Sequence, residues 1–199
     1  MQFESGHLYH IYNQGNNRQK IFFERDNYLF FLKKIRTYIL PYGDIIAWCL
    51  MTNHFHLMVL VRDTSVSVAH SDTDAVHIRT LNDSIGIMLR SYTSAINKQQ
   101  ERTGSLFREK TKAECIDCTK LSPSYITEDG VTKIDTTPVE NQYPQACFNY
   151  IHQNPVKAHL VKTAEKWEFS SAIDYLGLRD GDLINKDIAG KYINYFKPL

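Results

Sequence analysis

The sequence lacks the features that would mark it for secretion or place it in a membrane. Its amino terminus, MQFESGHLYH, has no basic start followed by an apolar stretch. Its apolar runs, of which Ile45 to Met51 and Leu57 to Val61 are the clearest, are far too short to span a bilayer. Internal repeats and low-complexity tracts are also missing. We therefore expect a cytoplasmic protein with no membrane partner.

The sequence also has little excess charge. Its 23 basic and 22 acidic residues leave a formal net charge of +1, whereas nucleic-acid affinity usually comes largely from neutralising phosphates. Composition alone therefore does not predict DNA binding, and any such surface must be local. With 43% hydrophobic and 23% charged residues in a chain of 199, we expect a single globular domain spanning 1–199.

Cysteine is scarce as well. Four cysteines in a chain without a secretion signal are more typical of reduced thiols than of a disulfide framework. Cys115 and Cys118 form a CxxC pair, but no second pair follows. A zinc site would therefore have to recruit Cys147 and a residue such as His152. The alternative is that the pair are small residues at a strand end and in a loop.

Hydrophobic periodicity and turn residues predict an alternation of strands and helices. The stretch 63–80 is polar and irregular. The stretch 117–143 is rich in Ser, Thr, Asp, Pro and Gly and is interpreted as an inserted loop or hairpin. Pro155 disfavours helical geometry at the preceding residue, so the last helix should span roughly eleven residues. In order, we expect a strand at 7–14, a helix at 26–40, strands at 45–51 and 54–61, a helix at 81–100, a strand at 106–116 and a helix from 144 to 154.

Strand, helix, strand, strand, helix, strand around one antiparallel sheet is typical of the split βαβ, ferredoxin-like pattern. We therefore predict an α+β fold with the His54–Val61 strand at the centre of the sheet and the helices on one face.

Two histidines stand in an HxH pattern on that central strand. Successive side chains of a strand point to opposite faces, so His54 and His56 project from one side while Phe55 and Leu57 take the other. Neutral imidazole is a common metal ligand, and a rigid strand presents two of them with little ordering cost. The alternative is two histidines that are hydrogen-bonded separately.

A second group lies on the last predicted helix. Tyr150 and Asn154 are four residues apart, which places them on one helix face. An amide oxygen is a good ligand for a hard divalent ion, and a tyrosine hydroxyl one turn away could attack a phosphate bound there. The alternative is that Tyr150, one of twelve tyrosines, packs its ring against the sheet.

Together these segments resemble a known family. NHFHLMV looks like the HxH motif of single-tyrosine HUH transposases, and the surrounding segments are similar to the branch called REP-associated tyrosine transposases. The matching segments run from about Gly6 to Gly177, and they are YHIYNQGNNRQKIF, AWCLMTNHFHLMV, GSLFREK, NYIHQNPVKAHLV and KWEFSSAIDYLG.

The resemblance implies a metal-dependent single-strand DNA endonuclease and transposase. It implies that His54, His56 and Asn154 bind a divalent metal, Mg²⁺ or Mn²⁺, with asparagine where related enzymes often carry glutamine. Tyr150 would be the nucleophile that leaves a 5′-phosphotyrosine and a free 3′-hydroxyl at hairpin-containing DNA. A homodimer is left open, in which Tyr150 could work with the metal of either subunit.

The resemblance also suggests residues that hold DNA: Asn16, Asn17, Arg18, Arg108 and Lys110, with the basic ones contacting phosphates. Two alternatives remain. The first is a domesticated, non-mobile protein that binds hairpin DNA, and the second is a hydrolytic nuclease in which activated water replaces Tyr150.

Overall fold

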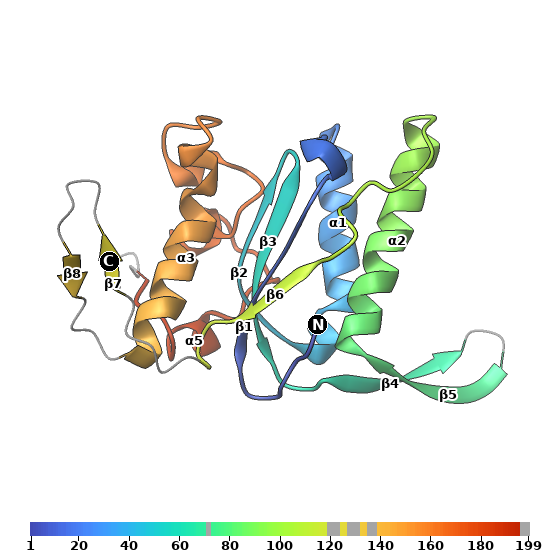
Figure 1. Ribbon diagram of the computed structural model, residues 1–199, viewed down its shortest axis with the longest axis horizontal. Helices are drawn as coiled ribbons and strands as arrows, with labels where there is room; N and C mark the ends of the chain where they lie inside the picture. Colours follow the sequence, from blue (N-terminus) through green and yellow to red (C-terminus); the bar gives the residue numbers. More distant parts are fainter. Residues whose placement is uncertain (71–72, 119–123, 127–131, 135–138, 196–199) are drawn as a thin grey trace.

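The computed structural model describes residues 1–70, 73–118, 124–126, 132–134 and 139–195 (Figure 1). Its centre is a four-stranded sheet in the order β2-β3-β1-β6, with every neighbouring pair antiparallel. The strands are β1 (Leu8–Gln14), β2 (Gly43–Met51), β3 (His54–Val61) and β6 (Lys112–Cys115).

Two long helices connect these strands. Helix α1 (Arg25–Tyr38) follows β1, and α2 (Leu81–Gln99) lies between β3 and β6 in the chain. This order and the sheet topology are those of the ferredoxin-like split βαβ pattern. The expected α+β class is confirmed, with the HxH strand β3 in the interior of the sheet.

The two faces of the sheet carry separate cores. Phe55, Leu57 and Val59 of β3 pack with α1 and α2, whereas Met58 packs on the other side with Ile151 and its neighbours on α3 (Val139–Lys157). Figure 1 shows α1 and α2 on one side of the sheet and α3 on the other. The expectation of helices on one face holds for α1 and α2 but is wrong for α3. The reason is that both faces of the central strands are apolar, so both need covering.

Helix α3 is longer than the sequence predicts, because it begins before Pro144 and ends at Lys157, beyond Pro155. An interior proline removes one helical hydrogen bond, but Pro155 lies only two residues from the end, so little of the helix is affected. Asn154 consequently keeps its place one turn from Tyr150.

Two further segments differ from expectation. The stretch expected to be irregular at 63–80 forms the hairpin β4 (Ser65–His70) and β5 (Thr73–Thr80). The strand expected at 106–116 is shortened to β6, preceded by an isolated bridge between Gly15 and Phe107. That bridge keeps the segment paired with the end of β1 without continuous strand geometry.

The insertion at 117–143 is described only in part. Strands β7 (Ser124–Ile126) and β8 (Thr132–Ile134) pair with each other in a small sheet of their own. The remainder of 119–138 lies outside the described residues. Helix α3 already starts at Val139, so the insertion ends earlier than expected. A single domain for the whole chain stays a prediction.

The cysteines also differ from expectation. Cys49 and Cys147 are free and buried, as expected of reduced thiols. Cys115 and Cys118 form a disulfide, and for this pair the expectation is wrong, because the end of β6 brings the two sulfurs together.

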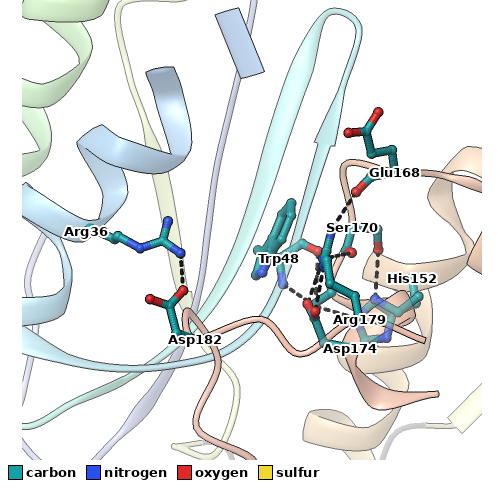
Figure 2. A network of polar contacts seen from close by, with 10 residues as sticks. Arg36, Trp48, His152, Glu168, Ser170, Asp174, Arg179 and Asp182 are labelled. Atoms are coloured by element: carbon teal, nitrogen blue, oxygen red, sulfur yellow. Dashed lines mark hydrogen bonds and ion pairs between the residues drawn. The ribbon is translucent and has the colours of Figure 1, made fainter. Parts of the chain in front are cut away.

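The carboxy-terminal segment is held against β2 by a polar network (Figure 2). This carboxy-terminal segment contains η3 (Ala164–Lys166), α4 (Ala172–Tyr175) and α5 (Lys186–Ala189). Arg179 Nε and Nη2 donate to the two carboxylate oxygens of Asp174 at 2.6 and 2.7 Å. Arg179 also donates to the carbonyls of Glu168 and Ser170. The Asp174 side chain is only 2% exposed, so the Arg179 guanidinium compensates the negative charge of a buried carboxylate.

None of the described helices is long and apolar enough to cross a membrane.

Candidate active site

The two histidines of β3 lie on the face that α3 covers. Their ring centroids are 4.9 Å apart, and β1 pairs with them through Gln14 opposite His54 and Tyr12 opposite His56. His56 is buried, at 4% exposure. Alternation along β3 thus places both imidazoles on one side of the sheet, as the sequence predicts.

Asn154 reaches both histidines from α3. Its Oδ1 lies 3.3 Å from His54 Nε2 and its Nδ2 lies 3.3 Å from His56 Nε2. Two imidazole nitrogens from one strand and one amide from a helix about 100 residues away therefore converge on one point. Each ring has a partner of its own on Nδ1, and in addition one amide joins the two rings through their Nε2 atoms.

The other ring nitrogens show how the imidazoles are oriented. His54 Nδ1 lies 2.6 Å from Asn53 Oδ1, an acceptor, so this nitrogen donates and Nε2 keeps its lone pair. His56 Nδ1 lies 2.9 Å from His10 Nε2. Burial lowers the pKa of His54, and lowers that of His56 well below its usual value. Both rings are therefore neutral at neutral pH, the form that binds metals.

This donor set fits a divalent cation. The lone pair of His54 Nε2 faces the Asn154 carbonyl oxygen at 3.3 Å, and two acceptors facing each other are stabilised when a cation lies between them. Imidazole nitrogen and amide oxygen together suit Mn²⁺ and Mg²⁺. Three protein ligands would leave further coordination positions for phosphate oxygens.

Tyr150 lies beside these residues, one turn before Asn154 on α3. Its ring centroid is 5.3 Å from that of His56 and 6.1 Å from that of His10, and Lys157 Nζ is 5.6 Å from the ring. The residue is 43% exposed, so it is not a core packing residue. It borders a cavity of about 460 Å³ that is also lined by His10, Tyr12, His56, Glu114 and Tyr143.

Three residues of the site were not recognised in the sequence. His10 contacts His56 directly, and Tyr12 Oη donates to Glu114 at 2.6 Å. This hydrogen bond, with burial and nearby charge, raises the pKa of Tyr12 to about 12. Alternation in HLYHIY would have placed His10 and Tyr12 on one face, but their approach to His56 depends on the pairing of β1 with β3.

His152, in contrast, points away from the site although it lies between Tyr150 and Asn154 in the chain. Its Nε2 lies 2.7 Å from Ser171 Oγ, within the network of Figure 2. Burial lowers the pKa of His152 to about 3. This histidine therefore joins α3 to the carboxy-terminal segment.

The expected DNA-binding residues gather at the end of β1. Asn16, Asn17 and Arg18 form η1 (Asn16–Arg18), and Arg108 donates its backbone N–H to the carbonyl of Gln14 at 2.8 Å. Asn17, Arg18, Arg108 and Lys110 are exposed, and Asn16 is partly buried. Because Gln14 pairs with His54, these groups lie at the same end of the sheet as the metal-ligand candidates.

Comparison with known proteins bears on the fold of the chain. No protein-family model and no curated protein matches the chain. Among solved structures, it is similar to a REP-associated tyrosine transposase bound to a REP hairpin, with a TM-score of 0.56 and 17% sequence identity. The match covers 99% of this chain and 93% of that one. The resemblance seen in the motifs is therefore confirmed at the level of the fold: the chain has the fold of a REP-associated tyrosine transposase.

Proposed function

We propose that the chain is a metal-dependent tyrosine transposase that nicks and rejoins single-stranded DNA at hairpins. The observation that supports this best is the convergence of both His54 and His56 Nε2 atoms on the Asn154 amide, with an exposed tyrosine one helical turn away. Neither a strand histidine pair nor a surface tyrosine would need the other for stability. A phosphoryl-transfer site requires a metal-binding group beside a nucleophile, and these residues would supply both.

His54, His56 and Asn154 would hold the ion, Mg²⁺ or Mn²⁺. When bound, the ion would supply Lewis-acid stabilisation of the negative charge that develops on the scissile phosphate. Asn53 contacts Nδ1 of His54, and His10 contacts Nδ1 of His56. These contacts fix the direction in which each Nε2 lone pair points.

Tyr150 carries the covalent step. Its Oη attacks the phosphorus, a bond forms between the two, and the bond from phosphorus to the 3′-oxygen breaks. The tyrosine proton is lost to solvent or a nearby base, and the departing 3′-oxygen takes up a proton, so the products are a 5′-phosphotyrosine and a 3′-hydroxyl. The reverse reaction rejoins a strand, and no nucleotide cofactor is needed because the ester bond is conserved.

Hairpin DNA is the proposed substrate. The structurally similar transposase is bound to a REP hairpin, and the exposed Arg18, Arg108 and Lys110 could contact phosphates close to His54. The near-neutral net charge makes this local cluster the main attraction for DNA, so the logarithm of the binding constant should fall with the logarithm of the salt concentration by a slope of about 0.7 to 0.9 for each phosphate contacted.

A denaturing gel tests the proposal. Labelled single-stranded hairpin DNA is incubated with Mn²⁺ and either the unaltered chain, Tyr150→Phe or Tyr143→Phe. Tyr143 is a matched control, since it borders the same cavity and is similarly exposed, at 38% against 43%. We expect a slow-migrating covalent adduct with the unaltered chain and Tyr143→Phe, and none with Tyr150→Phe.

The other outcomes separate the alternatives. Cleavage without an adduct would mean attack by water and a hydrolytic nuclease. Hairpin binding with neither adduct nor cleavage would mean a domesticated binding protein. An adduct that persists in Tyr150→Phe would assign the nucleophile to another residue.

A further inference from the structure

A second cluster of metal-ligating side chains lies away from the proposed active site. It consists of His7, Cys115, Asp117 and Cys118, whose ligand atoms all lie within 4.8 Å of one another. His7 immediately precedes β1, and the other three lie at and just after the end of β6. Tyr12, which pairs with His56, lies five positions after His7, roughly 17 Å along the strand, so this cluster and the His54–His56 site are distinct.

We propose that this cluster, with Cys115 and Cys118 as thiols, is a structural zinc site. Two thiolates, one imidazole and one carboxylate form a four-ligand set that suits tetrahedral Zn²⁺. The proposal is independent of the function proposed above, because none of the four residues takes part in it.

Three of the six distances between ligand atoms, those to Asp117 Oδ1, are close to the spacing around a tetrahedral ion. Zinc bonds of about 2.3 Å to sulfur and 2.0 to 2.2 Å to nitrogen or oxygen separate neighbouring ligand atoms by roughly 3.3 to 3.8 Å. Asp117 Oδ1 lies 3.3 Å from His7 Nδ1, 3.2 Å from Cys115 Sγ and 3.9 Å from Cys118 Sγ. The carboxylate thus lies at ligand spacing from all three other donors.

Groups around the cluster orient its ligands. The second ring nitrogen of His7, Nε2, lies 4.0 Å from a carboxylate oxygen of Glu4. This separation is too long for a hydrogen bond, and a small movement of the exposed Glu4 side chain would bring it to the position of the usual outer partner at zinc sites. Asp117 Oδ1 also accepts the backbone N–H of Leu8 at 3.0 Å, and its side chain is only 14% exposed. These contacts hold the carboxylate at the start of β1.

The disulfide between Cys115 and Cys118 is the oxidised alternative to this site. A bond between cysteines three residues apart closes a very short loop and so constrains the unfolded chain little. A metal would instead join His7 to residues about 110 positions away. Once the bond is reduced, the two thiols give up two protons to solvent on binding Zn²⁺. The sulfurs then move to roughly 3.8 Å apart, which side-chain rotation on Cα atoms 5.5 Å apart allows.

Such a site would fasten the edge strand of the sheet. Strand β6 has only four residues and, among the described strands, pairs with β1 alone, and short edge strands are easily frayed. The same strand carries Glu114, which holds Tyr12 beside the proposed active site.

The zinc partners that the sequence suggested are wrong: Cys147 is buried on α3 and His152 contacts Ser171.

Cobalt substitution tests the proposal on the full chain. The protein is reduced with a phosphine, which takes up the oxygen of a water molecule as the disulfide becomes two thiols. It is then stripped of metal with a chelator and titrated with Co²⁺ without oxygen. We expect one equivalent of Co²⁺ to give the thiolate-to-cobalt charge-transfer band and the intense visible bands of tetrahedral coordination. Excess Zn²⁺ should abolish both.

Matched variants locate the site. Cys118 is exposed, so Cys118→Ser should fold normally by circular dichroism yet lose the charge-transfer band or bind Co²⁺ at least tenfold more weakly. His7→Ala should weaken Co²⁺ binding as well. The double variant His54→Ala/His56→Ala should keep the band. The proposal is overturned if the reduced chain gives no such band, or if Cys118→Ser binds Co²⁺ as tightly as the unaltered chain with a band of unchanged intensity.

Discussion

His10 should control how well the proposed metal site binds its ion, although it would not touch the ion itself. His56 can bind through Nε2 only while its proton is on Nδ1. The partner of Nδ1 is His10 Nε2, at 2.9 Å in a buried position. Replacing His10 with Phe keeps a ring of similar size but removes the acceptor.

The size of the effect follows from this contact. Without His10, the Nδ1–H of His56 would be a buried donor with no partner, which costs about 1–3 kcal/mol. The ring avoids that cost by moving its proton to Nε2, where it blocks the metal. Loss of such an outer partner typically weakens metal binding 10- to 100-fold, about 1.4 to 2.7 kcal/mol. We therefore expect the Kd for Mn²⁺ to rise by this factor in His10→Phe.

Calorimetric titration with Mn²⁺ measures the change directly. His10→Gln supplies an amide oxygen as an acceptor and should recover part of the affinity. Tyr12→Phe is the control, because it removes the hydroxyl bonded to Glu114 on the same strand face without altering the His56 Nδ1 contact. If His10→Phe bound Mn²⁺ as tightly as the unaltered chain, His10 would not orient His56 and the reasoning would be refuted.

Three further predictions concern Asn154, the Arg179–Asp174 ion pair and the insertion. Asn154→Ala should abolish adduct formation on hairpin DNA, whereas Asn154→Gln, which keeps an amide oxygen, should retain part of it; equal loss in both would argue against the amide as a ligand. Arg179→Met should lower the free energy of unfolding by about 2–3 kcal/mol in chemical denaturation, because the buried Asp174 carboxylate loses its partner. Adding Asp174→Asn should restore much of that loss, and no recovery would place the defect elsewhere. Replacing residues 119–138 with a short flexible linker should leave the cooperative thermal transition intact, because β7 and β8 pair only with each other among the described strands. Loss of that transition would show that the insertion stabilises the fold.

Local sequence was enough to predict most of the regular elements. It also predicted, separately, the two residue pairs of the proposed site: His54 with His56, and Tyr150 with Asn154. Alternation along a strand depends only on neighbouring residues, so His54 and His56 could be placed on one face before any fold was known. The four-residue spacing of Tyr150 and Asn154 fixes their common helix face in the same way. Proline was a poorer guide, because α3 continues through Pro155 where tertiary packing outweighs one lost hydrogen bond.

Only the tertiary structure decided how these pieces meet. The contact of His10 with His56 depends on the register of β1 against β3, and a shift of one residue would turn His10 to the opposite face. The gathering of His7 with Cys115, Asp117 and Cys118 depends on the pairing of β1 with β6. Helix α3 brings Asn154 to the histidines because a second apolar face had to be buried. Spacing along the chain encodes which face a side chain takes, whereas strand pairing and core packing, set by residues 46 to 110 positions apart, decide which faces come together.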